Sequence, residues 1–250
     1  MHVARHVIRN RTFWDADAAD YQAVHGDALG AAPLAWGVWR IPETEVRALG
    51  DPAALRGLSA LELGCGAAQF AVELRTAGVA VTGLDVSTAQ LSYARRAAVD
   101  LPLIAGDAEH LPFGDQAFDL VFCDHGAMSF CDPDLTLPEV ARVLRPGGRL
   151  VFSMTTPWVY LTYDDERERQ TRKLQHNYFG MLVFSTGEGT TDFQIPYGEW
   201  IRAFNAYGFD VRDLIELRAP DGATTTYDFA PEWWARRWPA EQIWVVAKRA

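Results

Sequence analysis

The chain has 250 residues, a formal net charge of −10 and 49% hydrophobic residues. This length suits one α/β domain with a full core, or one domain plus a small cap. The acidic charge argues against a nucleic-acid partner, because proteins that bind polyanions carry a basic stripe. No apolar run approaches the ~20 residues of a membrane span, and the first residues lack the apolar core of a signal peptide. We therefore expect a cytoplasmic protein without membrane contacts.

The cysteine content is low. Cys65, Cys123 and Cys131 are the three cysteines, and an odd number in an apparently cytosolic chain predicts no disulfide framework. No C-x-x-C pair and no paired-histidine spacing indicates a metal site, so none is expected.

Residues 1–57 precede the first predicted core strand and are rich in aromatic residues. The pattern from Trp14 to Val24 predicts a short helix. Residues 35–42 read as a loop that leads into a second helix, with Pro42 near its first turn. The aromatic side chains of this segment either cover a ligand or pack on the edge of the sheet, and both interpretations stay open for Trp14, Tyr21 and Trp39.

Strand and helix patterns alternate between residues 58 and 154. The predicted strands are 58–63, 79–84, 101–105, 117–123 and 148–154, and the predicted helices are 67–77, 88–98 and 136–144. This alternation is typical of a parallel sheet with helices on both faces and right-handed crossovers. Pro146-Gly147-Gly148 is predicted to be a turn that precedes the fifth strand. Ligands of such sheets lie beyond the carboxyl ends of the strands.

The remainder of the chain departs from this alternation. Residues 155–196 are predicted to be an insertion, part helix and part strand, with a loop at Gly187-Glu188-Gly189. A helix follows over 197–207, and two closing strands are predicted over 209–217 and 241–248. The aromatic residues of 158–184 and 227–238 indicate a flat apolar pocket for a small organic molecule, with a satellite core as the alternative.

A glycine turn follows the first predicted strand, in Leu61-Glu62-Leu63-Gly64-Cys65-Gly66. A strand, a glycine turn and a helix together place a ligand against the helix N-terminus. Asp85 ends the second strand, 21 residues after Gly64, which is the offset at which an acid meets the ribose of a nucleotide. The alternative is a helix N-cap, a task that Ser87 or Thr88 could also perform.

The dinucleotide fingerprint requires a third glycine where this chain has Gln69. With the remaining motifs, the chain resembles the Rossmann-like, class I S-adenosylmethionine-dependent methyltransferases, in the group with a generic small-molecule methyltransferase domain. The resemblance covers residues 58–155 and rests on five motifs in order: LELGCG at 61–66, LDVS at 84–87, AGDA at 105–108 with LPF at 111–113, FDLV at 118–121, and LRPGGRL at 144–150.

The resemblance implies a fold and a domain organisation. The expected fold is a three-layer α/β sandwich with a mostly parallel seven-stranded sheet and an antiparallel C-terminal strand. Residues 1–250 would form a single domain, in which residues 1–57 are an N-terminal cover and residues 155–196 a cap-like insertion. A monomer and a homodimer are both compatible with it.

The resemblance also implies S-adenosylmethionine as cofactor, with S-adenosylhomocysteine as product. In the family, an acid at the position of Asp107 accepts from the adenine amine, and the N–H of the next residue, here Ala108, meets a ring nitrogen. Gln90 could reach the ribose. Arg40 could pair with the methionine carboxylate. The predicted cofactor-binding residues are Tyr21, Arg40, Glu62, Gly64, Cys65, Gly66, Gln69, Asp85, Val86, Gln90, Asp107, Ala108, Asp124 and His125.

Glu62 has two interpretations. At the end of the first strand it could orient the glycine turn or the methionine amino group, or it could cap nearby backbone N–H groups.

Methyl transfer is an in-line displacement that needs positioning, and it needs a base only where the acceptor must lose a proton. His125, just past the fourth strand, is the predicted catalytic base, because its ordinary pKa near 6.5 suits proton transfer at neutral pH. The alternative is that His125 only lines the pocket; His176 is the second candidate base. O-methylation is favoured, with nitrogen and carbon acceptors open. Two other functions stay open: a nicotinamide-dependent oxidoreductase, and a non-catalytic S-adenosylmethionine-binding protein.

Overall fold

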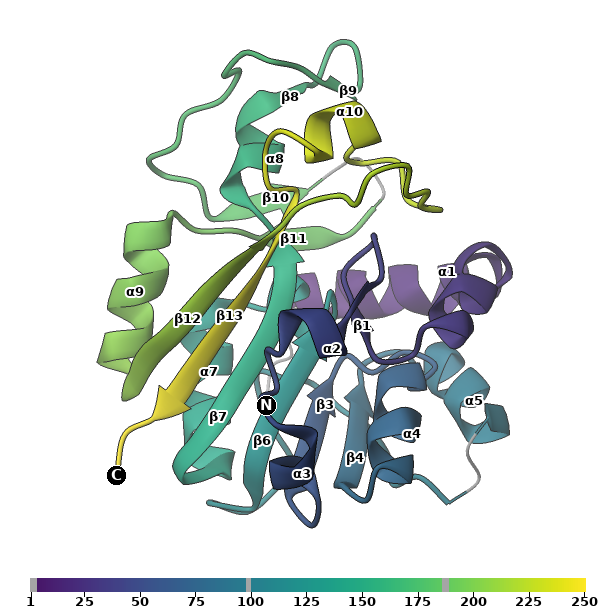
Figure 1. Ribbon diagram of the computed structural model, residues 1–250. Helices are drawn as coiled ribbons and strands as arrows, with labels where there is room; N and C mark the ends of the chain where they lie inside the picture. Colours follow the sequence, from purple (N-terminus) through teal and green to yellow (C-terminus); the bar gives the residue numbers. More distant parts are fainter. Residues whose placement is uncertain (1–3, 98–99, 186–188) are drawn as a thin grey trace.

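The structure is a computed structural model that describes residues 4–97, 100–185 and 189–250. Its centre is a seven-stranded sheet with the order β12-β13-β7-β6-β3-β4-β5 (Figure 1). The strands are β3 (Ser59–Leu63), β4 (Ala80–Asp85), β5 (Leu103–Ala105), β6 (Phe118–Asp124), β7 (Leu144–Thr155), β12 (Phe209–Leu217) and β13 (Glu241–Lys248). The pairs among β3 to β7 are parallel, and β13 runs antiparallel to both β7 and β12. The predicted fold class is confirmed.

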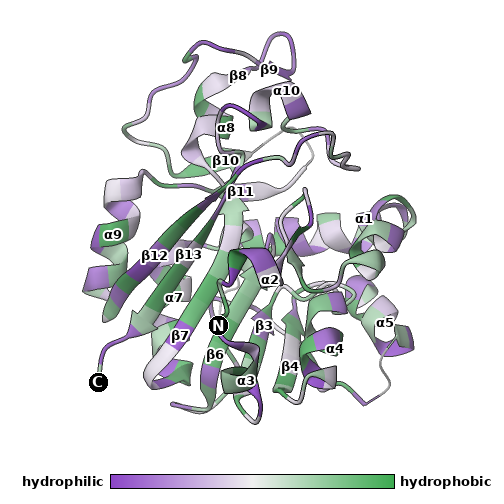
Figure 2. Cartoon of the chain, in the orientation of Figure 1, coloured by the Kyte–Doolittle hydropathy of each residue, from purple (hydrophilic) through white to green (hydrophobic). Residues whose placement is uncertain are grey.

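Alternation along the strands divides the core into two layers, one on each face of the sheet. Leu61 and Leu63 pack in one buried cluster with helices α7 (Pro133–Val143) and α9 (Tyr197–Ala206), whereas Ala60 packs in another. That second cluster includes α4 (Gln69–Thr76) and α5 (Thr88–Ala97). Successive strand side chains point to opposite faces, so the central strands are hydrophobic along most of their length (Figure 2).

The N-terminal segment differs from the prediction in two ways. Helix α1 spans Arg5–Ala31, 27 residues, rather than Trp14 to Val24 alone. The predicted loop over 35–42 contains an antiparallel hairpin of β1 (Ala35–Trp36) and β2 (Ile41–Pro42). The short helices α2 (Glu43–Val46) and α3 (Pro52–Leu55) follow, and Pro42 stands directly before α2 as expected.

Several predicted boundaries also differ, among them those of α4, α7 and β7. Helix α4 begins at Gln69 because Ala68 adopts a left-handed conformation with φ of 61°. Helix α7 begins at Pro133, three residues early, because the Asp132 side chain caps it by accepting from the Asp134 N–H. Strand β7 begins at Leu144, before the predicted 148, but its pairing with β6 passes from Leu144 directly to Arg149, so residues 145–148 form an irregularity at the predicted turn, where Gly147 has φ of 76°.

The insertion after β7 and the segment between β12 and β13 lie together beyond the carboxyl ends of the parallel strands (Figure 1). Their elements are α8 (Pro157–Thr162), β8 (Tyr163–Asp164), β9 (Arg169–Gln170), β10 (Val183–Ser185), β11 (Thr191–Phe193) and α10 (Glu232–Ala235). Of the predicted loop at 187–189, residues 187 and 188 lie outside the described residues. Trp234 and Trp238 pack with Trp39 and Val159 in a third cluster, so these aromatic residues form the satellite core.

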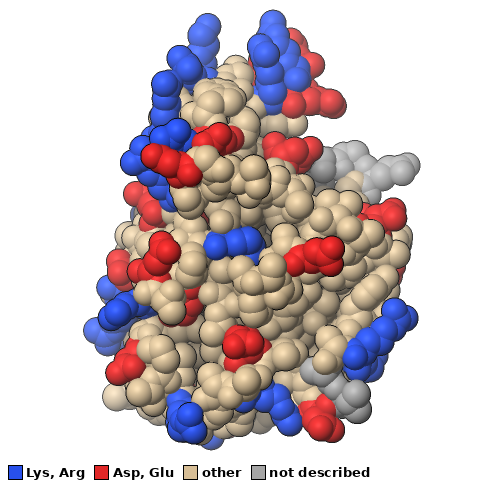
Figure 3. All heavy atoms as spheres, turned by 45° about the vertical axis from the view of Figure 1, so that its right-hand side comes forward, with Lys and Arg blue, Asp and Glu red and all other residues tan. Residues whose placement is uncertain are grey.

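No described helix combines the length and the hydrophobicity needed to cross a membrane. On the face shown in Figure 3, basic and acidic side chains are interspersed, and a basic side chain lies near its centre.

Candidate active site

One cavity opens at the carboxyl ends of β3, β4, β5 and β6. This is the place where the chain order of the sheet reverses, since β4 lies on one side of β3 and β6 on the other, and it is the expected ligand position in such sheets. All fourteen residues predicted to bind cofactor line this cavity. The described structure thus brings the predicted site residues together, while their individual roles stay predictions.

The glycine turn depends on two glycines that face each other across β3 and β6. Gly64 has φ of 69°, and a Cβ atom at this position would collide with the backbone of Gly126 and Ala127. A Cβ atom at Gly126 would in turn collide with the carbonyl oxygens of Leu63 and Gly64. Gly66 is different: it has φ of 54°, and its nearest neighbour for a Cβ atom is Gln90 Oε1 at 4.0 Å. Gly64 is therefore required by packing, whereas Gly66 leaves space for a ligand.

Asp85 ends β4 and is held by two backbone groups. Its Oδ2 accepts from the Gly66 N–H at 2.7 Å and its Oδ1 from the Ser87 N–H at 2.8 Å. Burial raises the pKa of the Asp85 carboxyl to about 6, although these two hydrogen bonds act to lower it. Ser87 caps α5 by accepting from the Gln90 N–H at 3.1 Å, so Asp85 is not the sole cap of this helix.

Asp107 follows β5 at the other end of the cavity. Its Oδ1 accepts from the Glu109 N–H at 2.9 Å, which fixes the turn after the strand, and Ala108 is buried beside it. Trp14 and Phe130 contact each other edge to face, with ring centroids 5.3 Å apart, and both line this cavity. Of the two interpretations of Trp14, the structure therefore favours a place at the ligand cavity over packing on the edge of the sheet.

Glu62 performs the capping role that the sequence left open. Its Oε2 accepts from the Ala71 N–H of α4 at 3.2 Å. Burial raises the pKa of the Glu62 carboxyl well above its usual value, and the neighbouring charge of Asp124 adds to this. Burial likewise raises the pKa of the Cys65 thiol well above its usual value, so a thiolate nucleophile is not favoured there.

Arg40 and Asp124 form an ion pair in the cavity wall. Arg40 Nη1 donates to Asp124 Oδ2 at 3.0 Å, and Nη2 donates to the Ala32 carbonyl at 2.6 Å. Both terminal nitrogens of the guanidinium therefore already donate hydrogen bonds within the protein, which the sequence did not suggest. Its Nε is buried and has no hydrogen-bond partner among the described residues, so one donor is left to meet an anionic ligand group.

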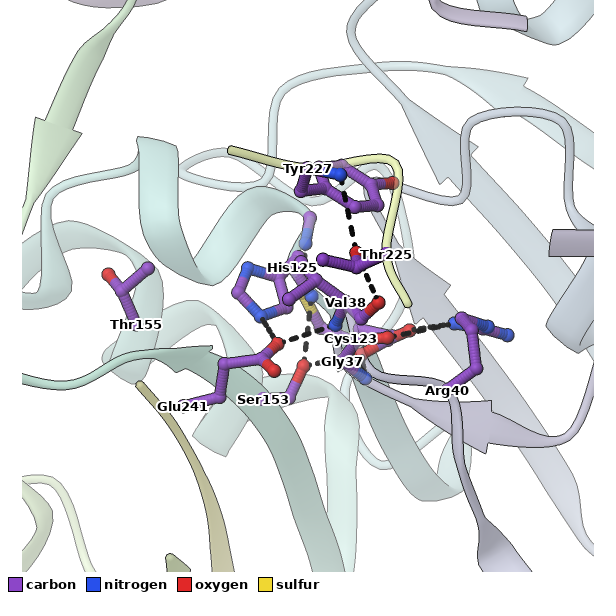
Figure 4. Close-up of polar contacts among 12 residues, drawn as sticks. Gly37, Val38, Arg40, Cys123, His125, Ser153, Thr155, Thr225, Tyr227 and Glu241 are labelled. Atoms are coloured by element: carbon purple, nitrogen blue, oxygen red, sulfur yellow. Dashed lines mark hydrogen bonds and ion pairs between the residues drawn. The ribbon is translucent and has the colours of Figure 1, made fainter. Parts of the chain in front are cut away.

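His125 lies just past β6, on the wall of the same cavity. Its Nε2 is 2.5 Å from Oε1 of Glu241, the first residue of β13 (Figure 4). Burial acts to lower the pKa of His125, but the hydrogen bond and the charge of Glu241 outweigh it, so the pKa is raised. His176 is not among the residues that line the cavity, and its Nε2 lies 2.9 Å from the Tyr163 carbonyl oxygen, so the structure does not bring this second candidate base into the site.

Helix α1 covers the cavity through contacts that the sequence did not reveal. Asp15 accepts from Ser87 Oγ at 2.8 Å and from the Ala89 N–H at 3.1 Å, at the start of α5. Tyr21 meets Tyr227 hydroxyl to hydroxyl at 2.7 Å. Burial raises the pKa of Tyr21 well above its usual value. These partners are between 72 and 206 residues apart in sequence, and no local pattern indicates them.

Comparisons with known proteins agree with this arrangement. Residues 61–152 match the family model described as "Methyltransferase domain", inside the region that carries the predicted resemblance. A demethylmenaquinone methyltransferase from Mycobacterium sp. (strain JLS) is 41% identical over 109 residues, which are 42% of this chain and 46% of that protein. The chain therefore spans about half the length of the curated relatives that it matches.

Solved structures share the fold over most of the chain. An S-adenosylmethionine-dependent methyltransferase from Mesorhizobium loti superposes with a TM-score of 0.67 at 24% identity, over 82% of this chain and 96% of that one. A Burkholderia thailandensis 1,6-didemethyltoxoflavin-N1-methyltransferase, solved with bound 1,6-didemethyltoxoflavin and S-adenosylhomocysteine, gives a TM-score of 0.60 at 16% identity, over 100% of this chain and 93% of that one. At these identities the likeness establishes the fold.

Proposed function

We propose that this chain, whose residues 61–152 match a methyltransferase-domain family model, is a class I methyltransferase that binds S-adenosylmethionine and transfers its methyl group to a small organic molecule. One observation carries the proposal: the fourteen predicted residues, from six separate segments, line a single cavity at the carboxyl ends of the parallel strands. A structural role for each residue separately gives no reason for this convergence.

The polar groups of the cavity match those of the cofactor. Asp85, with two backbone bonds already made, retains lone pairs for the ribose hydroxyls. Asp107 and the Ala108 N–H offer one acceptor and one donor to adenine. Gly66 leaves the space that a close backbone approach needs, and the buried Arg40 Nε suits the methionine carboxylate.

We infer that the acceptor binds beside His125, Tyr21 and Arg40, which line the same cavity. Because His125 Nε2 is engaged by Glu241, the ring is oriented as a base requires, and this supports O-methylation over transfer to a neutral amine. The demethylmenaquinone methyltransferases among the relatives make a ring compound a reasonable first acceptor. A cytoplasmic location and a monomeric or dimeric state stay predictions.

Two other functions were open. A nicotinamide dinucleotide is disfavoured because Gln69 occupies the third glycine position of its fingerprint. A cofactor-binding protein without activity differs from a methyltransferase only in turnover. The test is S-adenosylhomocysteine formation with a panel of phenols, hydroxyquinones and amines. We expect formation with at least one hydroxylated ring compound. Cofactor binding without turnover on any member of the panel would favour the non-catalytic alternative.

Cofactor affinity is expected to depend on pH through Asp85. The carboxylate is the form that accepts from ribose hydroxyls, and burial raises the pKa of Asp85 to about 6. Affinity for S-adenosylmethionine should thus be constant above pH 7 and fall towards pH 5, where protonation removes the acceptor. Calorimetric titrations at several pH values measure this, and Asp85→Asn should bind weakly without the same dependence. A wild-type affinity that is flat from pH 5 to 8 would contradict the role given to Asp85.

A further inference from the structure

Glu241 is a buried acid whose side chain contacts His125, beside the proposed acceptor site, and the hairpin turn next to it. It is fully buried at the start of β13. Its Oε1 accepts from the Val38 N–H at 2.7 Å and lies 2.5 Å from His125 Nε2. Its Oε2 is buried and has no hydrogen-bond partner among the described residues. Keeping a carboxyl group under such conditions costs stability, which calls for a functional reason.

The turn between β1 and β2, residues 37–40, holds this acid and Asp124 at the same time. Gly37 donates its N–H to Asp124 Oδ1 at 2.9 Å, and the next N–H, of Val38, is the one that binds Glu241 (Figure 4). Gly37 has φ of 69°, and a Cβ atom there would overlap the Glu241 carboxyl group. The N-terminal hairpin is thus fitted closely around Glu241.

The geometry fixes which nitrogen of His125 is the base. A carboxylate beside Nε2 favours the tautomer with its proton on Nε2, which donates to Glu241. Nδ1 then carries the lone pair. It points away from Glu241 (Figure 4), and within the described part of the chain it has no hydrogen-bond partner. The side chain, 24% exposed, lines the cavity.

The backbone of His125 is also held in an uncommon conformation. Its φ is 50°, a region that costs a non-glycine residue energy. The His125 N–H donates to Ser153 Oγ at 3.1 Å, and Ser153 Oγ donates in turn to Asp124 at 2.5 Å. Neighbouring strands therefore fix both the backbone and the ring of this residue.

We propose that Glu241 is a positioning residue that holds His125 as a general base, so that the acceptor is a group that must lose a proton: a phenolic or enolic hydroxyl, or an acidic C–H. The proposal rests on the proposed function. Nδ1 takes the acceptor's proton, and the freed electron pair forms the bond to the methyl carbon as the carbon–sulfur bond breaks towards sulfur. The imidazolium that results is stabilised by the Glu241 carboxylate and later returns its proton to water.

The charged groups that face His125 come from three elements. Glu241 of β13 and Asp124 of β6 favour the protonated ring, whereas Arg40 of the hairpin turn opposes it. Removing the charge of Glu241 leaves burial as the largest influence on the pKa of His125, and burial lowers it; Asp124 then acts to raise the pKa and Arg40 to lower it. The Glu241→Gln variant should therefore have a lower His125 pKa than the wild type.

The test is an NMR titration of the ¹⁵N-histidine-labelled protein between pH 5.5 and 9, with the His125 signals assigned from His125→Asn. We expect His125 to carry its proton on Nε2, and its pKa to fall by about one unit in Glu241→Gln. Glu109→Gln is the matched control, because Glu109 is a second buried acid paired with a histidine: its Oε1 lies 2.6 Å from His6 Nε2. This control should leave the His125 titration unchanged.

An Nδ1–H tautomer in the wild type, or an unchanged His125 pKa in Glu241→Gln, would overturn the proposal. The tautomer is measured on the wild type, so this test does not depend on whether the variant folds. With an acceptor in hand, Glu241→Gln should lower kcat by 10- to 100-fold with little change in KM. It should also move the acidic limb of the pH–rate profile to lower pH. If Glu241→Gln turns over and the acidic limb of its pH–rate profile lies at the wild-type pH, the positioning role of Glu241 is refuted. If NMR shows the His125–Glu241 pair as expected but the wild type turns over no acceptor, methyl transfer is refuted instead.

Discussion

The Gly64→Ala variant is expected to lose roughly 3 kcal/mol or more of unfolding free energy, because strain and overlap act together. A left-handed conformation costs an alanine about 1 kcal/mol, and the new Cβ atom would collide with backbone atoms of Gly126 and Ala127. Backbone atoms cannot move aside as a flexible side chain would. Thermal unfolding should show a decrease in Tm of about 10 °C.

Variants at two other glycines distinguish the cost of backbone strain from the cost of atomic overlap. Gly147 is also left-handed, with φ of 76°, but has no atom within 4 Å of a Cβ position, so Gly147→Ala measures the conformational cost alone, about 1 kcal/mol. Gly66→Ala should be nearly as stable as that control and yet lose cofactor affinity, because its methyl group enters the cavity. Equal Tm values for the three variants would contradict the packing argument for Gly64.

The His125→Asn variant is expected to lose 10²- to 10⁴-fold in kcat, the usual contribution of a general base. Its affinity for S-adenosylmethionine should change little, since the proposed contacts to the cofactor come mainly from Asp85, Asp107 and the glycine turn. In the wild type, kcat/KM should fall as the pH drops through the His125 pKa, which Glu241 raises above its ordinary value. The neutral ring is the active form, so activity is lost on the acidic side.

His176→Asn is the matched control for this prediction. His176 bonds a backbone carbonyl outside the cavity, so the variant should keep wild-type turnover. Full activity in His125→Asn, measured on a hydroxylated acceptor with normal cofactor binding, would refute the base assignment and leave His125 as a wall of the cavity.

Local patterns predicted the sheet and the side of the cavity that the sheet provides. The strands over 209–217 and 241–248 begin and end where they were predicted, because apolar residues alternate in the first and form a short continuous run in the second. The glycine turn, Asp85 and Asp107 could be identified because each follows directly from a strand end. Strand ends of a parallel sheet share one edge, so residues placed by chain order alone meet in space.

The parts of the site that lie outside the parallel strands could not be predicted from local sequence patterns. Glu241 is 116 residues from His125 in sequence, and within its own strand it looks like an ordinary terminal residue. The hairpin at 35–42 resembled a loop because each strand has only two residues. Helix α1 was underestimated because its apolar periodicity is weak; tertiary contacts, such as Asp15 at the start of α5, stabilise it more than local pattern does.

The most direct test of the central claim is a calorimetric titration at pH 7.5 of the wild type and Asp85→Ala with three ligands: S-adenosylmethionine, S-adenosylhomocysteine and reduced nicotinamide adenine dinucleotide. We predict binding of the two adenosyl ligands alone, weakened in the variant by about 2–3 kcal/mol, or roughly 30- to 150-fold. Binding of the nicotinamide compound in place of the adenosyl ligands would contradict the account and make the glycine turn a pyrophosphate site.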